Sequence, residues 1–274
     1  MNRILSYCLI FGMVSQAVAF SAGAYSIPNH TFITKRAVDE YTYCAPILKL
    51  PELPKDAGES LKNGNLGEDL AIFRKFVNWH LYNPNKALGS IRSMVGRVGR
   101  LETQMRKKPS WKVLGGILHY VQDVTNPAHV APVFHTTADC FDNFPFDSNV
   151  WLPFSADRCK AIYQEPSMKK GYWENIDAVA KETLARIEQP FLFTRGGVAQ
   201  IDSWSHAFWD PQYTSKGNNG LGAYGVFGNR FGVADFGNVK VDSGDFLEFA
   251  ATQIHSALDA SLLLIEKYAG TLHE

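Results

Sequence analysis

The sequence predicts an all-α fold. We expect a single compact multi-helix domain over residues 25–274, with a long loop or short hairpin excursion near residues 196–240. Apolar residues recur at helical spacing through most of the chain. Hydrophobic residues make up 46% and charged residues 20% of the 274 positions, which supplies enough apolar material for a core. The excursion is predicted because its stretch is rich in Gly, Asn and aromatic residues.

Residues 1–24 have the layout of a secretory signal peptide. Met1-Asn2-Arg3 is a short positive start, Ile4–Phe20 is mostly apolar, and two small-x-small cleavage signatures follow, Ala17-Val18-Ala19 and Ala22-Gly23-Ala24. We favour cleavage after Ala24, with cleavage after Ala19 as the alternative. A buried N-terminal helix is the competing interpretation. The protein is therefore expected to be secreted or periplasmic.

Export changes the interpretation of the cysteines. Removal of Cys8 with the signal peptide leaves three, so at most one internal disulfide can form. We expect Cys140 to pair with Cys159, because the two flank one loop. Three unpaired thiols, including Cys44, are the alternative.

Helices are expected in chain order over residues 30–43, 65–82, 85–107, 110–125, 172–188 and 245–269. Asn29 is expected to cap the first helix, and the pattern Asn65-Leu66-Gly67-Glu68 resembles a capping box that opens the second. Pro109 and Pro127 end the third and the fourth. The fourth is apolar on nearly all sides, which predicts a central buried helix. Residues 136–170 are expected to be irregular.

Histidines and carboxylates recur at single-turn spacing. His119 and Asp123 are four residues apart, so both lie on one face of the central helix. His129 follows the turn at Pro127, and His135 and Asp139 are again four apart.

Further candidate ligands lie upstream. Asp69 and His80 are eleven residues apart, close to three helical turns, and His30 begins the first helix. Each pattern alone is more often a surface contact or a satisfied core residue. Together they place polar groups from three helices in a core that cannot bury them unpaired. Imidazole and carboxylate ligands suit zinc, so the combination predicts a multi-metal zinc site.

Taken in order, four segments resemble the zinc-dependent phospholipase C family over nearly the whole mature chain. They are His30-Thr-Phe-Ile-Thr-Lys-Arg-Ala-Val-Asp-Glu, Asp69 with His80, His119-x3-Asp123-x5-His129 and His135-x3-Asp139. Relatives of this family are the single-strand-specific zinc nucleases of the S1/P1 type. The central block, Leu118-His-Tyr-Val-Gln-Asp-Val-Thr-Asn-Pro-Ala-His129, looks like the phospholipase version.

The resemblance implies a trinuclear zinc site with three ions. The ligands of the first would be His80, His119 and Asp123, with Asp69 near or on the ion. The ligands of the second would be His129, His135 and Asp139. The third would be held by His30 and Asp123, and completed by the α-amino group and first carbonyl of the mature chain, here Tyr25.

The function implied by the resemblance is that of a secreted zinc metallophospholipase C. A zinc-bound hydroxide would hydrolyse the glycerol-side phosphodiester of a phospholipid to diacylglycerol and a phosphorylated headgroup. Asp69 is the candidate to orient or deprotonate the water, with a plain ligand role as the alternative. The expected partner is phospholipid at a membrane surface, and the protein is expected to be a monomer.

Two other functions compete with this one. An S1/P1-type zinc nuclease would act on single-stranded nucleic acid, but Lys plus Arg and Asp plus Glu number 27 each, so no basic field favours a stable nucleic-acid partner. A non-catalytic zinc-binding protein on the same scaffold is the other. A further hypothesis places Tyr224, Phe227 and Phe231 in contact with lipid, against the alternative that they fold onto the body.

Overall fold

The computed structural model describes residues 26–70, 80–82, 93–131, 133, 139–146, 152–164, 171–210, 223–233 and 235–271. The predicted signal peptide, Tyr25 and His135 lie outside these residues, as does the beginning of the helix predicted from residue 85. Within the described part of the chain, none of the helices combines the length and the hydropathy needed to cross a membrane.

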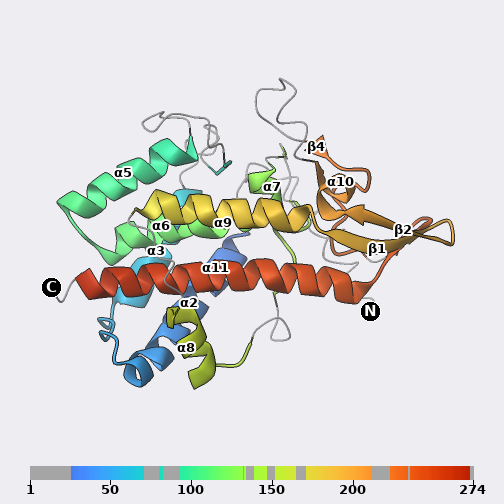
Figure 1. Cartoon of the computed structure of the whole chain (residues 1–274). Helices are drawn as coiled ribbons and strands as arrows, with labels where there is room; N and C mark the ends of the chain where they lie inside the picture. Colours follow the sequence, from blue (N-terminus) through green and yellow to red (C-terminus); the bar gives the residue numbers. More distant parts are fainter. Residues whose placement is uncertain are drawn as a thin grey trace.

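Most of the described chain is helical (Figure 1). The helices are α2 (Ile27–Leu48), α3 (Ala57–Asp69), α5 (Met94–Lys107), α6 (Trp111–Asp123), α7 (Pro127–Val130), α8 (Ala156–Gln164), α9 (Tyr172–Ile187), α10 (Trp204–Ala207) and α11 (Ser243–Thr271). The strands are β1 (Pro190–Arg195), β2 (Val198–Ser203), β3 (Trp209–Asp210), β4 (Ala223–Tyr224), β5 (Asp235–Phe236) and β6 (Val239–Val241).

Helix α6 is central and buried, which confirms the sequence prediction. The Ser110 hydroxyl caps its start by accepting from the backbone N–H of Val113 at 3.3 Å. All of its residues except Lys112 and Val113 are buried. Helices α3, α5, α9 and α11 pack around it, and α9 lies alongside α11 (Figure 1).

The contact between α3 and α6 depends on two glycines. A Cβ at Gly64 would lie 1.9 Å from the carbonyl oxygen of Lys112, and a Cβ at Gly115 would lie 2.1 Å from the carbonyl oxygen of Leu61. Both distances are far below van der Waals contact, so any other residue would push the helices apart. Glycine at both positions lets the two backbones touch.

The first predicted helix starts at a different residue. Helix α2 begins at Ile27, earlier than expected, because Pro28 suits the first turn of a helix, where no intrahelical N–H bond is lost. Asn29 therefore does not cap the helix. Its side chain donates instead to the carbonyl oxygen of Asp142 at 2.7 Å, which ties α2 to the segment that follows α7.

The second predicted helix is also wrong in its bounds. Helix α3 ends at Asp69 instead of opening at Asn65, so Asn65 and Glu68 lie in its last turns, where both are buried. Asp69 and His80 consequently do not share one helix, since His80 lies in a turn. Helix α8 forms within residues that the sequence predicts to be irregular.

The all-α prediction is incomplete. Residues 190–241 contain a four-stranded antiparallel sheet in the order β2-β1-β6-β5, and β3 pairs with β4. Phe191 and Phe193 of β1 enter an aromatic core formed with α10, α11 and the segment around Phe231. A hairpin was one of the two forms expected for the excursion near 196–240, and β1–β2 supplies one.

The predicted lipid contact of the aromatic segment is wrong for two of its three residues. Phe227 is 5% and Phe231 1% exposed, so both fold onto the body. Tyr224 is half-buried and packs against the same core. The aromatic side chains of this segment are therefore core residues, as the alternative interpretation held.

The disulfide also differs from the expected one. Cys44 of α2 is bonded to Cys159 of α8, across 115 residues of sequence, and Cys140 is not part of this bond. The expected pairing used distance along the chain, whereas α8 packs directly on α2 and brings Cys159 to Cys44. A structural disulfide is compatible with an oxidising compartment outside the cytosol.

Candidate metal centre

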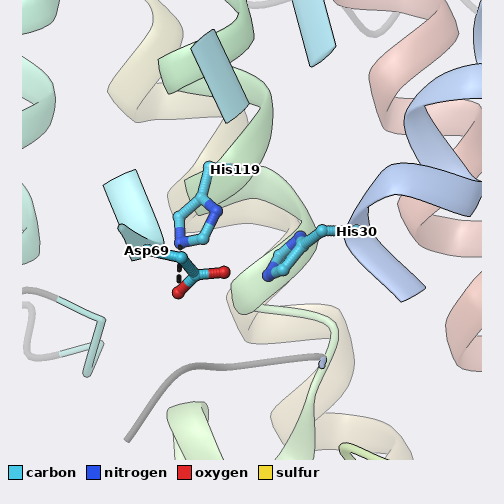
Figure 2. Close-up of side chains that lie close together, drawn as sticks. All are labelled: His30, Asp69 and His119. Carbon is cyan, nitrogen blue, oxygen red and sulfur yellow. Dashed lines mark ion pairs between the residues drawn. The ribbon is translucent and has the colours of Figure 1, made fainter. Parts of the chain in front are cut away.

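Five of the predicted ligands converge on one buried point. His30 lies in the first turn of α2, Asp69 is the last residue of α3, His119 and Asp123 face the same way one turn apart on α6, and His80 approaches from the segment 80–82. Each is at most 4% exposed. Figure 2 shows His30, Asp69 and His119 directed toward one another from three helices.

Asp123 is the hub of this arrangement. Its Oδ1 lies 3.2 Å from Nε2 of His30, and its Oδ2 lies 2.9 Å from Nδ1 of His80 and 3.4 Å from Nε2 of His119. Nε2 of His119 is also 3.9 Å from Oδ1 of Asp69. The imidazoles of His30 and His119 stack with their centroids 4.2 Å apart.

These side chains form two groups that could each hold a cation. One consists of His80, His119 and Asp123, and the other of His30, Asp69 and His119. In each group the candidate ligand atoms lie within 4.8 Å of one another. His119 belongs to both groups, but one imidazole nitrogen binds one ion, so His119 could serve only one of the two groups at a time.

Two buried amides orient the imidazoles. Nδ1–H of His30 donates to Oε1 of Gln122 at 2.8 Å, and Nδ1–H of His119 donates to Oδ1 of Asn65 at 3.1 Å. The amide oxygens can only accept, so both rings carry a proton on Nδ1 and direct Nε2 into the cage. That is the tautomer that a metal bound at Nε2 requires.

The two amides are themselves held in place. Nδ2 of Asn65 donates to Oε1 of Gln122 at 2.9 Å and to the hydroxyl of Thr34 at 3.0 Å. Nε2 of Gln122 donates to the hydroxyls of Thr34 and Ser261, at 3.2 and 3.3 Å. This network joins α2, α3, α6 and α11 behind the imidazoles and fixes the direction of both rings.

A buried ion pair lies behind the other side of the cage. Nε and Nη2 of Arg97 donate to the carboxylate of Glu68 at 2.8 and 2.5 Å, and the hydroxyl of Tyr120 donates to the same carboxylate at 2.7 Å. The Tyr120 ring contacts the rings of His119 and His80, with centroids 5.3 and 5.7 Å apart. Glu68 precedes Asp69 and Tyr120 follows His119, so the bond between Glu68 and Tyr120 links the two chain segments that carry these ligands.

The charges of the site favour the ligand forms of His119 and Asp123, whereas burial lowers the pKa values of His30 and His80 less than Asp123 raises them, so both end above their usual value. Burial holds the pKa of His119 well below its usual value, although the Asp123 carboxylate acts the other way. Burial alone would raise the pKa of Asp123, but the imidazoles of His119, His30 and His80 outweigh it and hold that pKa well below its usual range. Asp123 is therefore ionised and His119 neutral, the states in which these side chains bind metals.

The donor set fits a metal ion such as zinc. The Nε2 atom of His80 is buried and has no hydrogen-bond partner among the described residues. A buried polar atom without a partner is costly, and a cation would satisfy it. Imidazole nitrogens and carboxylate oxygens are the ligands that zinc takes in catalytic sites.

The remaining predicted ligands lie on the segments that follow α6. Nδ1–H of His129 donates to the carbonyl oxygen of His80 at 2.6 Å, so α7 and the segment 80–82 are tied together beside the cage. The carboxylate of Asp139 accepts from the backbone N–H of Phe141 at 2.7 Å and from the indole of Trp209 at 3.4 Å. His135 and Tyr25, the other two predicted ligands, lie outside the described residues.

Sequence reasoning missed the residues that support the ligands: Asn65, Glu68, Arg97, Tyr120 and Gln122. A signal for them was present. Gln122 is a polar residue in a mostly apolar helix, three residues after His119. The capping box predicted for Asn65 and Glu68 is wrong, because both lie in the last turns of α3.

Comparison of the chain with protein-family models, with curated proteins and with solved structures finds no match to any of them.

Proposed function

We propose that the protein is a secreted zinc-dependent phospholipase C, which hydrolyses the glycerol-side phosphodiester of phospholipids to diacylglycerol and a phosphorylated headgroup. The observation that carries this proposal is the convergence of three imidazoles and two carboxylates in one buried cage. Five ionisable groups at the centre of a helical core would destabilise the fold, because each costs free energy when it is desolvated. A bound metal ion would offset this cost.

The order of these residues along the chain supports the choice of reaction, because it resembles that of the zinc-dependent phospholipases C. His80, His119 and Asp123 are the residues we assign to one zinc ion, and His30 and Asp69 could contribute to a neighbouring one. We assign His129, His135 and Asp139 to a further ion, and Tyr25 to the completion of the ion nearest His30. Zinc bound at such a cage neutralises an anionic phosphodiester and lowers the pKa of water toward about 7.

The residues of the chain have distinct roles in this proposal. Asp69 ends α3 with its Oδ1 3.9 Å from Nε2 of His119, which suits it to orient the attacking water and accept its proton. Asn65 and Gln122 hold the imidazoles of His119 and His30 in one tautomer. Asp123 contacts all three imidazoles, which hold its carboxylate in the ionised form.

Secretion is part of the proposal. The disulfide between Cys44 and Cys159 is compatible with an exported protein, and the first 24 residues resemble a signal peptide. N-terminal sequencing of the protein recovered from the periplasm and the medium tests this part directly, because cleavage after Ala24 would expose Tyr25.

The test of the function uses purified, disulfide-bonded protein. Metal content is measured by mass spectrometry, and hydrolysis is followed on phosphatidylcholine vesicles, on a monomeric short-chain phosphatidylcholine and on single-stranded DNA. We expect bound zinc, release of diacylglycerol and phosphocholine, and no cleavage of DNA. Cleavage of DNA alone would identify a nuclease, and zinc without any hydrolysis would identify a non-catalytic zinc-binding protein.

A matched pair of variants assigns the activity to the cage. His119→Gln removes the ligand shared by both groups and should abolish zinc binding and hydrolysis together. His206→Gln is the control, because His206 is exposed, pairs with Asp202 on the same short segment and belongs to neither group. Unchanged hydrolysis by His119→Gln would refute the proposal.

A further inference from the structure

The β1–β2 hairpin extends past the ends of α9 and α11 (Figure 1). Its register runs from Pro190 opposite Ser203 to Arg195 opposite Val198. Gly196 and Gly197 form the tip with φ of 58° and 80°, a left-handed backbone that favours glycine. Strand β2 is the outer edge of the four-stranded sheet.

The two faces of the hairpin are both apolar, but only one is covered. Phe191 and Phe193 point into the aromatic core and are 7% and 5% exposed. Leu192 and Ile201 lie directly opposite each other on the outer face and are 57% and 72% exposed. Val198 lies opposite Arg195 at the tip, on the same face as Phe193 but beyond the core, and is 62% exposed.

This concentration of exposed aliphatic side chains is unusual. Among the described residues, the five most exposed large hydrophobic side chains include three from this hairpin, Leu192, Val198 and Ile201. An apolar edge strand is normally protected by charge, by proline or by a covering segment, because it promotes aggregation. An uncovered apolar group of this kind marks a surface that meets another apolar phase or partner.

The size of the surface distinguishes the possible partners. A stable interface between two proteins buries about 800 Å² on each side. At the exposures observed, the three aliphatic residues provide less than half of that, so a second copy of the chain is not the favoured partner. A lipid bilayer needs only a few apolar side chains that enter the interface, together with cations near the headgroups.

Cations of this kind flank the apolar group. Arg195 is exposed at the tip. Lys240 lies opposite Thr194 in the register of β1 and β6; its side chain is 70% exposed and its Nζ lies 4.0 Å from the carboxylate of Asp235. Both side chains are long enough to reach headgroups while the aliphatic residues enter the interface.

The hairpin is attached firmly to the segment that carries the candidate ligands. Phe191 and Phe193 belong to the same buried cluster as Ala128, which precedes His129, and as Phe141, which follows Asp139 closely. A surface on the hairpin is therefore held in a fixed relation to the metal centre. A membrane bound there would present its lipids at a defined distance from the cage.

We propose that the outer face and tip of the β1–β2 hairpin dock the protein on a phospholipid bilayer, with Leu192, Ile201 and Val198 entering the interface. This rests on the proposed function, since the bilayer is then the surface that carries the substrate. It differs from the hypothesis of a lipid contact through Phe227 and Phe231, which are buried.

The test measures binding separately from hydrolysis. Metal-loaded protein is floated with vesicles of a phosphatidylcholine analogue in which a methylene group replaces the scissile glycerol oxygen, with and without phosphatidylglycerol. The variant L192S/I201S is expected to lose 10- to 100-fold in its partition coefficient, and V198S up to tenfold, because each removes aliphatic surface that the lipid would bury. Hydrolysis of a monomeric short-chain phosphatidylcholine should change less than about twofold, because the hairpin does not form the cage.

The control variant is I47S/L152S, which removes two aliphatic side chains that are 40% and 46% exposed on α2 and beside α8. It should bind vesicles like the unmodified protein. Equal flotation of L192S/I201S and the unmodified protein would overturn the docking proposal and leave the phospholipase function standing. Flotation that depends on the hairpin, without hydrolysis of any phospholipid, would support the docking proposal and overturn the phospholipase function. A dimer that L192S/I201S dissociates in sedimentation would assign the surface to a second copy and overturn the proposal.

Discussion

Replacement of Asn65 by Leu tests whether buried amides control the metal centre. Asn and Leu have nearly the same shape, so the substitution removes polarity and preserves packing between α3 and α6. Asn65 makes three buried hydrogen bonds, to Nδ1–H of His119 at 3.1 Å, to Thr34 at 3.0 Å and to Gln122 at 2.9 Å. The hydroxyl of Thr34 and Oε1 of Gln122 each keep another donor, from Gln122 and His30 respectively.

The Nδ1–H of His119 therefore loses the amide oxygen that accepts from it. A buried donor without an acceptor costs about 1–3 kcal/mol. The ring also loses the contact that fixes its tautomer, and loss of such a contact lowers metal affinity by about 10- to 100-fold. We expect N65L to bind zinc with an affinity reduced by that factor and to unfold at a lower temperature.

The assay is competition for zinc with a chromogenic chelator, supported by the absorption spectrum of the cobalt-substituted protein, which reports the geometry of the ligands. Asn63→Leu is the matched control, because Asn63 lies on the same helix but is exposed, and its side chain donates to Glu59, away from the cage. An unchanged zinc affinity in N65L, with a cobalt spectrum identical to that of N63L, would show that Asn65 does not act on the metal.

Other predictions concern stability. Glu68→Gln removes the carboxylate charge that faces the buried guanidinium of Arg97 and should cost about 3–5 kcal/mol in urea unfolding; a loss below 1 kcal/mol would contradict this. C44S/C159S opens a loop of 115 residues and should lower the free energy of unfolding by about 4–5 kcal/mol, an effect that reductant should reproduce in the unmodified protein. Burial raises the pKa of Tyr41 to about 12, so the native state keeps a proton that the unfolded chain loses near pH 10. The free energy of unfolding should therefore fall as the pH rises from about 10 to 12. Absorbance titration at 295 nm should show a phenol that ionises only above about pH 10.

The parts of the fold that follow a strong local pattern could be predicted from the sequence. Helix α6 is apolar on nearly all sides and bounded by Ser110 and Pro127, and α9 and α11 have clear helical periodicity; all three form close to their expected bounds. The spacing of His119 and Asp123 requires one helix face, which the structure has.

The parts that depend on tertiary contacts could not be predicted. Asn65 and Glu68 match a helix start locally, yet both bond to other helices and lie near the end of α3. The cysteine pairing depends on the packing of α8 against α2, which no local pattern reports. Strand β1 lacks the alternation typical of a half-buried strand, because Leu192 is apolar on its exposed side.

The glycine contact between α3 and α6 limits which amino-acid substitutions the metal centre can tolerate. Metal sites tolerate errors of only about 0.2 Å in ligand distance. A single methyl group added at Gly64 or Gly115 would meet a backbone oxygen at about 2 Å and displace Asp69 relative to His119 by more than that tolerance. Gly64 and Gly115 thus set the distance between the helices that carry Asp69 and His119. Mutational scanning should find them as intolerant as the ligands, although neither has a group that touches a metal.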